Sequence, residues 1–490
     1  MSDLIAAVET IRQHAHDYHL AEQYYEGSVG EVFCSAAVRR ALRGATGEFD
    51  INLARRPVDA VLDRIDITAL RVPGSDDISQ WLVDAVWTPN RMERYAKTVH
   101  WGALTYGDCY LIVWPGVLEG TVDVHYNSPI TTRVFYDPED PRIKSYAAKM
   151  WEVGYGDGAV TRVNLYYADR IEKYVTKPGT KGVQDADFEP YQDEGEPWPI
   201  PNPFDTVPVF HFRTSEPYGR PEHRGAFGPQ NAITKLSTTL MATVDFQGFP
   251  QRYGLLDPKA STDDLFDVDP DDESLAPDGS GSNLVASPGT LWKLPGMSSV
   301  GQFQPAGVGA FLEPMSAYTR WMAAATATPL RFFDPQGQIP SGEALRADEA
   351  PLAARIRDRE DFFGEEWSET LRFAAHVLGV EIPVVDVQWR PVQTIDDLQG
   401  WQTVAAKIEA GVPTQQALTE AGYTGDVVSG WLEGSEKPNF DSRVDALVKI
   451  GQAMQFLGSA VQLGSVEKEQ VDAILSQVLG ELIRDEPPAP

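Results

Sequence analysis

The sequence predicts an α+β protein, because the spacing of its apolar residues changes twice along the chain. Up to about residue 104, apolar residues recur at intervals of three and four, as on one face of a helix. From Cys109 to Phe212 they occur in short alternating runs that are typical of strands. The helical spacing returns after Gly225. A chain of 490 residues with this pattern is expected to form several sub-domains.

Four helices are expected in the first hundred residues. The first follows Ser2, a suitable N-cap, and ends at Gly27, which tolerates the left-handed conformation common at helix ends. The second has Pro57 in its first turn, where its missing amide hydrogen costs no intrahelical bond. The third and fourth are expected around residues 78–85 and 91–104.

Short strands separated by turn residues follow these helices. They are expected at Cys109–Trp114, Val122–Tyr126, Val134–Tyr136, Ser145–Val153, Val160–Tyr167, Arg170–Thr176 and Val207–Phe212. Pairs such as Asp137-Pro138 and Pro178-Gly179 mark turns between them. Residues 177–203 are rich in acids and prolines and show little periodicity, so a linker is expected there.

After Gly225 the sequence predicts two helices separated by an irregular segment. Their apolar stripes consist of Ile233, Leu236, Leu240 and Val244 in the first and Phe311, Met315, Tyr318, Met322 and Ala325 in the second. The segment between them, residues 251–303, is rich in Gly, Pro, Asp and Ser.

A much longer helix is predicted from Ser341, its N-cap, to Leu378, because one apolar face continues without a break. At about 1.5 Å per residue it would be roughly 54 Å long. Pro351 is expected to bend it near its start. The chain from about Ile395 onwards is again helical in pattern, with longer helices at about 441–463 and 467–484.

The composition is strongly acidic, with 72 acidic and 41 basic residues and a net charge of −31. Proteins that hold duplex DNA tightly do so largely through Lys and Arg, so this chain is not expected to grip DNA. On charge alone, solubility is the preferred explanation of this composition. Cys34 and Cys109 are too few for a disulfide framework. No signal peptide and no membrane-spanning run are expected.

No sequence motif for catalysis or for a cofactor stands out. The sequence contains no P-loop, GxSxG, HExxH, CxxC pair or GxGxxG. We therefore expect a chain that is not an enzyme and has no cofactor. An acidic intracellular hydrolase of the glycosidase type stays open as an alternative, because such enzymes need only two carboxylates about 5–9 Å apart in a cleft.

One acidic segment partly resembles a calcium-binding loop. Asp267, Asp269 and Asp271 have the spacing of its first three ligands. However, Asp272 stands where glycine is needed, and Asp278 stands where glutamate is needed. We expect no metal site and interpret the segment as a solvated acidic loop.

Several segments, in order along most of residues 20–430, resemble the portal proteins of tailed bacteriophages that the phage SPP1 portal typifies. These segments are Tyr24-Tyr25-Glu26-Gly27, Asn52–Arg64, Gly107-Asp108-Cys109-Tyr110, Tyr136-Asp137-Pro138, Asn202–Phe212, Gly225–Arg252, Thr328-Pro329 and Ser341–Leu345.

The resemblance implies a portal-like subunit with an α/β wing, a two-helix stem, a small clip, a long spine helix and a helical crown. The expected parts are the wing at 1–224, the stem helices at 225–250 and 304–327, the clip at 251–303, the tunnel loop at 328–340, the spine helix and a return into the wing at 341–394, and the crown at 395–490.

The resemblance also implies a function: a ring, expected to be a dodecamer, at the capsid vertex, through which the genome is packaged and ejected. The expected partners are double-stranded DNA in the channel, the terminase large subunit, a head–tail adaptor protein, and the major capsid and scaffolding proteins. The subunit would assemble in the host cytoplasm, end in the virion and contact no membrane. Another structural head or tail protein is the second alternative.

Candidate channel residues follow from the same resemblance. They are Arg331, Phe332, Phe333, Gln336 and Gln338 in the tunnel loop and Lys235 and Arg320 in the stem. The three basic side chains would touch the DNA backbone or pair with acids of a neighbouring subunit. The two phenylalanines would narrow the channel or pack beneath the loop.

Overall fold

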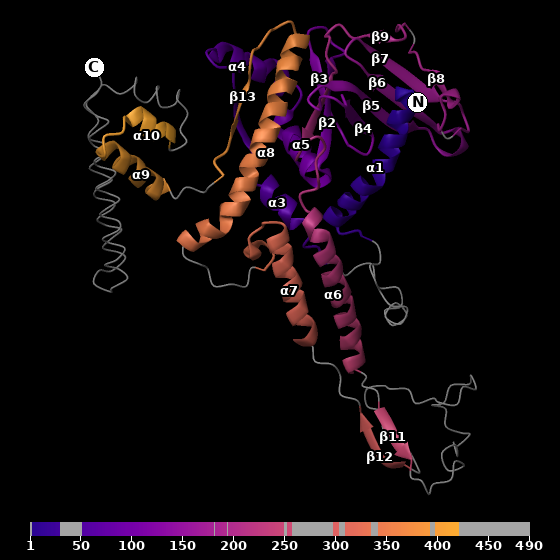
Figure 1. The fold of residues 1–490 in the computed structure, drawn as a ribbon, viewed down its shortest axis with the longest axis vertical. Helices are drawn as coiled ribbons and strands as arrows, with labels where there is room; N and C mark the ends of the chain where they lie inside the picture. Colours follow the sequence, from indigo (N-terminus) through magenta and orange to yellow (C-terminus); the bar gives the residue numbers. More distant parts are fainter. Residues whose placement is uncertain are drawn as a thin grey trace. The chain divides into compact units, whose positions relative to one another are not determined.

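The computed structural model describes residues 2–29, 51–180, 182–193, 195–248, 252–256, 297–302, 309–334, 342–392 and 397–420 (Figure 1). The chain divides into two compact units, Met1–Val392 and Gln393–Pro490. Helices and sheets are mixed in the first unit, as the sequence predicts, and the second unit is described by two helices.

The centre of the first unit is a three-stranded antiparallel sheet in the order β10-β2-β3 (Val209–Arg213, Asp108–Pro115 and Val122–Asn127). Alternate side chains of a strand point to opposite faces. On β2, Cys109, Leu111 and Val113 pack among helices, whereas Tyr110 and Ile112 pack against a second sheet. Because both faces are covered, β2 is apolar at almost every position.

The second sheet contains six strands, five of them antiparallel in chain order. They are β4 (Thr132–Tyr136), β5 (Lys144–Val153), β6 (Val160–Tyr166), β7 (Arg170–Thr176) and β8 (Phe188–Pro190), and β9 (Ile200–Pro201) pairs with β7. The prediction of a linker at residues 177–203 is therefore wrong, because β8 and β9 lie within that segment. Strands of two and three residues are too short to show an alternating pattern in the sequence.

Helix α1 (Asp3–Glu26) covers the other face of the second sheet. Both predicted ends are confirmed. The Ser2 hydroxyl accepts a hydrogen bond from the amide of Ile5, and Gly27 has φ 79°. Leu4, Val8 and their apolar neighbours on α1 pack on residues of β5, β6 and β8.

A further group of helices in the first unit packs on the three-stranded sheet from the opposite side. They are α3 (Arg56–Leu62), α4 (Asp76–Leu82), a π-helical turn at Val83–Trp87, α5 (Met92–Tyr106) and α8 (Gly342–Val377). Single 3-10 turns lie at Gly156–Gly158, Asp185–Asp187, Arg224–Ala226 and Leu330–Phe332.

The long helix predicted from Ser341 is confirmed as α8, although Ser341 itself lies outside the described residues. Its predicted apolar face is buried through Leu352, Ile356, Phe363, Trp367, Leu371 and Ala374. Figure 1 shows a bend close to the N-terminal end of α8, and Pro351 is the tenth residue of that helix. A proline within a helix removes one hydrogen bond and bends the axis.

Helices α6 (Phe227–Gly248) and α7 (Gly309–Ala325) lie side by side (Figure 1). The start of α6 and the end of α7 meet in one buried cluster, which contains Ile233, Met322 and Tyr24 of α1. The two helices are therefore antiparallel. Between them in the sequence, β11 (Arg252–Leu256) and β12 (Met297–Gln302) form an antiparallel pair within a segment expected to be irregular.

The sequence did not predict a small sheet made of β1 (Ile67–Arg71) and β13 (Asp386–Trp389). In the second unit, α9 (Asp397–Glu409) and α10 (Thr414–Glu420) pack through Val404, Ala417 and Leu418. Among the residues that the structure describes, no helix is both long enough and apolar enough to cross a membrane. The helices expected at 441–463 and 467–484 lie outside the described residues.

Candidate functional site

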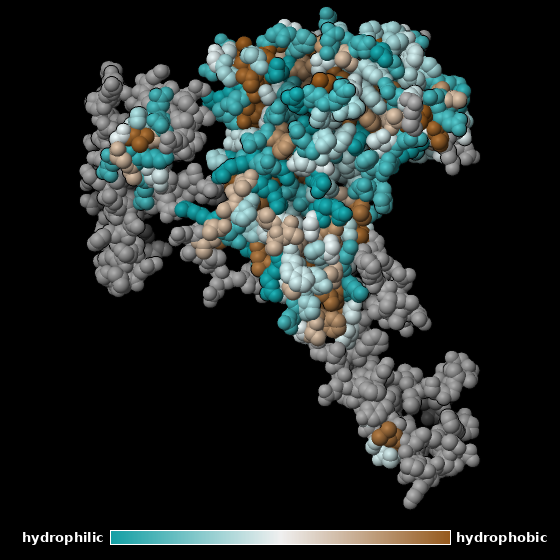
Figure 2. All heavy atoms as spheres, in the orientation of Figure 1, coloured by the Kyte–Doolittle hydropathy of each residue, from teal (hydrophilic) through white to brown (hydrophobic). Residues whose placement is uncertain are grey.

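The α6–α7 pair exposes large apolar side chains and few charges. Met241, Val244, Leu312 and Trp321 are all more than 40% exposed, and Trp321 is 60% exposed. Figure 2 shows pale and brown atoms over α6 and α7, whereas the body of the same unit is largely teal. Exposed apolar surface of this kind commonly marks an interface with another protein.

The two basic stem candidates lie on these helices. Lys235 on α6 and Arg320 on α7 are exposed, and within the described parts of the chain neither has an ion-pair partner. Many of the other polar groups of α6 are satisfied internally. The hydroxyls of Ser237, Thr238, Thr239 and Thr243 each donate to the carbonyl four residues earlier.

The start of the predicted tunnel loop is held against the body. Phe333 is buried in the cluster that contains Met322. Phe332 is half-buried, with the guanidinium of Arg64 5.2 Å and that of Arg331 5.3 Å from its ring centroid. Both phenylalanines therefore pack within the described part of the subunit.

Arg331 itself is paired within the subunit. It donates to Glu349 on α8, and its Nη1 lies 3.6 Å from Asp348 Oδ2. Glu349 also accepts a hydrogen bond of 3.3 Å from Arg64 Nη2. The structure therefore joins the loop to the first turns of α8 and to the end of α3. Gln336, Gln338 and the acidic candidates Asp267, Asp269 and Asp271 lie outside the described residues.

A second connection, which the sequence reasoning missed, joins α8 to the segment before α6. The Glu222 side chain is 3% exposed and lies between two arginines of α8. Arg359 Nε donates to its Oε2 at 3.0 Å, and Arg355 Nη1 forms an ion pair with its Oε1 at 3.0 Å. Arg359 also donates to the Thr214 carbonyl at 2.8 Å. The only sequence signal was the four-residue spacing of the two arginines, which places them on one helix face.

Asp108 is the centre of a buried polar network at the start of β2. Its oxygens accept hydrogen bonds from the Tyr18 hydroxyl at 2.8 Å, from His211 Nε2 at 2.8 Å and from the Gly219 amide at 2.7 Å. Burial lowers the pKa of His211, although Asp108 opposes that shift. A neutral His211 that donates from Nε2 and accepts the Tyr136 hydroxyl at Nδ1, 2.8 Å away, satisfies the whole network.

An open cleft of about 470 Å³ lies beside this network, between α1, β4 and the segment that leads into α6. Its polar lining includes Arg133, Arg220 and Arg224 together with Asp17 and Asp108. Both Asp108 oxygens are already used, so the cleft does not offer the pair of free carboxylates that a glycosidase needs.

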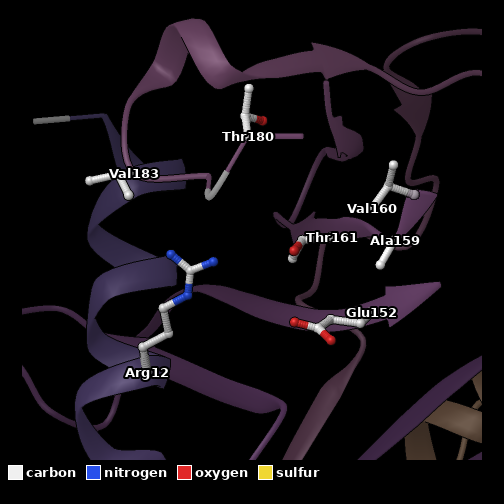
Figure 3. A pocket seen from close by; sticks show the side chains of 7 residues that line it. All are labelled: Arg12, Glu152, Ala159, Val160, Thr161, Thr180 and Val183. Carbon is white, nitrogen blue, oxygen red and sulfur yellow. The ribbon is translucent and has the colours of Figure 1, made fainter. Parts of the chain in front are cut away.

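A second cavity of about 380 Å³ lies between α1 and the second sheet (Figure 3). Arg12 comes from α1 and Glu152 from β5, and Figure 3 shows both side chains at the cavity. Arg12 Nη1 donates to the Gly182 carbonyl at 2.9 Å. Glu152 is the single carboxylate in this lining, so the hydrolase alternative gains no acid pair here either.

Among the described residues, no group of three or more His, Cys, Asp or Glu side chains is placed to hold a metal ion. Cys109 is a free, buried thiol. Burial raises its pKa well above the usual range, so it packs as a small apolar side chain and is not a reactive thiolate.

Comparison with known proteins gives matches to phage portal proteins. Residues 13–226 match the family described as phage portal protein, SPP1 Gp6-like. The portal protein of Mycobacterium phage D29 is 22% identical over 409 residues, which cover 76% of each chain. That of Mycobacterium phage L5 is 23% identical over 407 residues, again 76% of each chain.

Solved structures of gene transfer agent particles are also similar. A chain of the native virion is 14% identical with a TM-score of 0.41, and the match covers 84% of this chain and 99% of that chain. A chain of the empty particle's neck, computed with C6 symmetry, is 15% identical with a TM-score of 0.42, covering 81% and 96%.

Proposed function

The chain belongs to the SPP1 Gp6-like family of phage portal proteins, structural components of the virion at the capsid vertex, and we propose that it forms there a ring-shaped channel for genomic DNA. In this proposal the protein acts by its shape and its charge. It opens a passage through the vertex and lets duplex DNA slide in during packaging and out during ejection.

The observation that carries the proposal is the antiparallel α6–α7 pair. Its exposed apolar side chains, Trp321 foremost, are suited to packing against the same helices of adjacent copies. Its low charge also suits a channel wall. Because DNA is held mainly through phosphate contacts with Lys and Arg, a wall with few of them lets the duplex move.

We assign the parts of the subunit on the same basis. Residues 1–224 form the wing, 225–250 and 304–327 the stem helices, and 251–303 the clip. Residues 328–340 form the tunnel loop, 341–394 the spine helix with its return into the wing, and 395–490 the crown. The positions of α6, α7 and α8 in the chain support these assignments.

Arg331 donates to Glu349 of α8, and this pairing supports a role for Arg331 in positioning the tunnel loop. Gln336 and Gln338 would then form the narrowest part of the channel. Lys235 and Arg320, exposed on the stem helices, are the cations available to touch the DNA backbone briefly. Phe332 and Phe333 support the loop from below.

The partners follow from the position that we propose. A vertex channel meets the packaging motor at its clip, through the terminase large subunit, and later a head–tail adaptor protein. It meets the major capsid and scaffolding proteins at its wing during assembly in the host cytoplasm. We propose a dodecamer and assign the chain no catalytic activity.

The proposal is tested by electron microscopy and light scattering of the purified full-length protein. We expect closed rings, and we expect Trp321→Glu to lose them because a charge then lies in the apolar contact between copies. Tyr155→Glu is the matched control, since Tyr155 is 99% exposed in a surface turn. A wild-type protein that stays monomeric at every concentration would rule out the channel.

A further inference from the structure

We propose that the cleft beside Asp108, here called the Arg133 cleft, binds an acidic side chain from a second copy of the chain. The Arg133 cleft is the space lined by Tyr18, Tyr106, Arg133, Tyr218, Arg220 and Arg224. The inference rests on the proposed ring, because only a ring keeps a second copy next to each cleft.

Arg133 is the first reason. Its side chain belongs to β4, and the residue is only 6% exposed. The guanidinium lies 3.8 Å from the Tyr218 ring centroid, and its Nη1 reaches the Tyr18 hydroxyl at a long 3.4 Å. Its Nε is buried with no hydrogen-bond partner. Within the described residues no carboxylate lies within ion-pair distance of this buried cation.

Asp108 does not fill that role, although it lines the same cleft. Its oxygens already accept from Tyr18, His211 and Gly219, at 2.7–2.8 Å. Hydrogen bonds link Arg133 to this carboxylate only through the Tyr18 hydroxyl, although the charge of Asp108 also acts on Arg133. A buried charge is costly unless it is paired and its donors are satisfied, so the free donor of Arg133 calls for a further acceptor.

Two more cations stand in the lining. Arg220 and Arg224 are exposed, and neither forms an ion pair in the part of the chain that the structure describes. The lining thus holds three guanidinium groups against Asp17 and the occupied Asp108. Other arginines of the chain are paired with a carboxylate, as Arg355 and Arg359 are with Glu222. In a protein with a net charge of −31, unpaired arginines gathered in one cleft are suited to an anionic ligand.

The charge of the chain favours a second copy as the source of that anion. Carboxylates are its most abundant charged groups, 72 of them against 41 bases. A ring holds neighbouring copies at a high effective concentration, so a modest contact is enough to keep the cleft filled. Guanidinium and carboxylate form strong, charge-assisted hydrogen bonds that are often bidentate. A cleft of about 470 Å³ has room for a short acidic segment.

The test uses the full-length protein with the photo-crosslinking residue p-benzoylphenylalanine in place of Arg224. Isotopically heavy and light copies are mixed before assembly, irradiated and analysed by mass spectrometry. We expect heavy–light cross-linked peptides that contain Asp or Glu. Cross-links confined to one copy would show that the chain fills its own cleft, and cross-links to added duplex DNA would show a nucleic-acid site; either result overturns the inference.

A charge reversal supplies the second measurement. We expect the double variant Arg220→Glu with Arg224→Glu to raise the concentration needed for rings at least about tenfold, which is about 1.4 kcal/mol. The double variant Arg94→Glu with Lys97→Glu makes the same change of charge on the exposed face of α5 and should shift it much less. Rings unaffected by the cleft variant would overturn this inference and leave the proposed function standing. Absence of rings in the wild type would overturn both.

Discussion

Gly107 and Gly219 let two segments cross more closely than any side chain would permit. A Cβ atom on Gly107 would lie 2.6 Å from the amide nitrogen of Arg220, and one on Gly219 would overlap the Gly107 carbonyl oxygen. The crossing places the Gly219 amide 2.7 Å from Asp108. These two glycines therefore position the buried network and one side of the Arg133 cleft.

We predict that Gly107→Ala destabilises the fold much more than Gly120→Ala. Both glycines have positive φ, 92° and 78°, so both variants are strained by about 1–2 kcal/mol. Only at Gly107 does the new methyl group also meet backbone atoms, which adds about 1–3 kcal/mol. Thermal unfolding of both variants measures the difference. Equal melting temperatures would show that the crossing relaxes freely.

At the scale of elements, α8 is the part to which the others are tied. Its apolar face packs in the main core, Glu349 holds Arg331 of the loop, and Arg355 and Arg359 hold Glu222 before α6. The start of α6 and the end of α7 share one cluster. α8 is therefore connected both to the start of the loop and to the segment that precedes α6.

We predict that Glu222→Gln weakens this connection strongly. The change leaves two partly buried arginines without their shared counter-ion, and breaking a buried pair costs about 3–5 kcal/mol. Glu216→Gln is the control, because Glu216 is 60% exposed in its pair with Arg213, and such pairs contribute about 0–1 kcal/mol. Urea unfolding of both variants gives the two values. If Glu222→Gln lowers the free energy of unfolding no more than Glu216→Gln does, the pairing does not hold α8 to the segment before α6.

The elements also show what the sequence can and cannot predict. α1 and α8 were predicted closely, because long helices repeat their apolar spacing many times and carry local end signals such as Ser2 and Gly27. The β1–β13 pair was missed because its strands are short and lie more than 300 residues apart. The Glu222 pairing was missed for a related reason, since nothing local in the sequence marks a carboxylate for two distant arginines.

The whole molecule combines an acidic surface with buried, neutral histidines. Burial lowers the pKa of His100 to about 3 and that of His223 to about 4, and it lowers the pKa of His211 as well. His100 accepts a hydrogen bond of 2.9 Å from Trp367 Nε1, which connects α5 with α8. The neutral form of each ring is therefore the form that the folded protein keeps.

This distribution predicts that stability falls as the pH drops below about 6.5. Below this pH the histidines bind protons in the unfolded chain but stay neutral in the folded protein. Each of His100 and His223 therefore lowers the free energy of unfolding by about 1.4 kcal/mol per pH unit until the pH reaches its folded pKa. Glu360 has the opposite effect on stability. Burial raises its pKa to about 7, so as the pH falls the folded form takes up this proton before the unfolded form does. Three histidines lower the stability and one carboxyl raises it, so a net loss of stability is expected. Melting temperatures between pH 7.5 and 5 measure it.

The His100→Gln variant identifies the source of that loss. Glutamine cannot take up the proton, yet its carbonyl can accept the Trp367 hydrogen bond, so the melting temperature should depend less on pH than in the wild type. His16→Gln is the control, because His16 is exposed on α1 and should leave the slope unchanged. Identical slopes for all three proteins would show that His100 is not a source of the acid sensitivity.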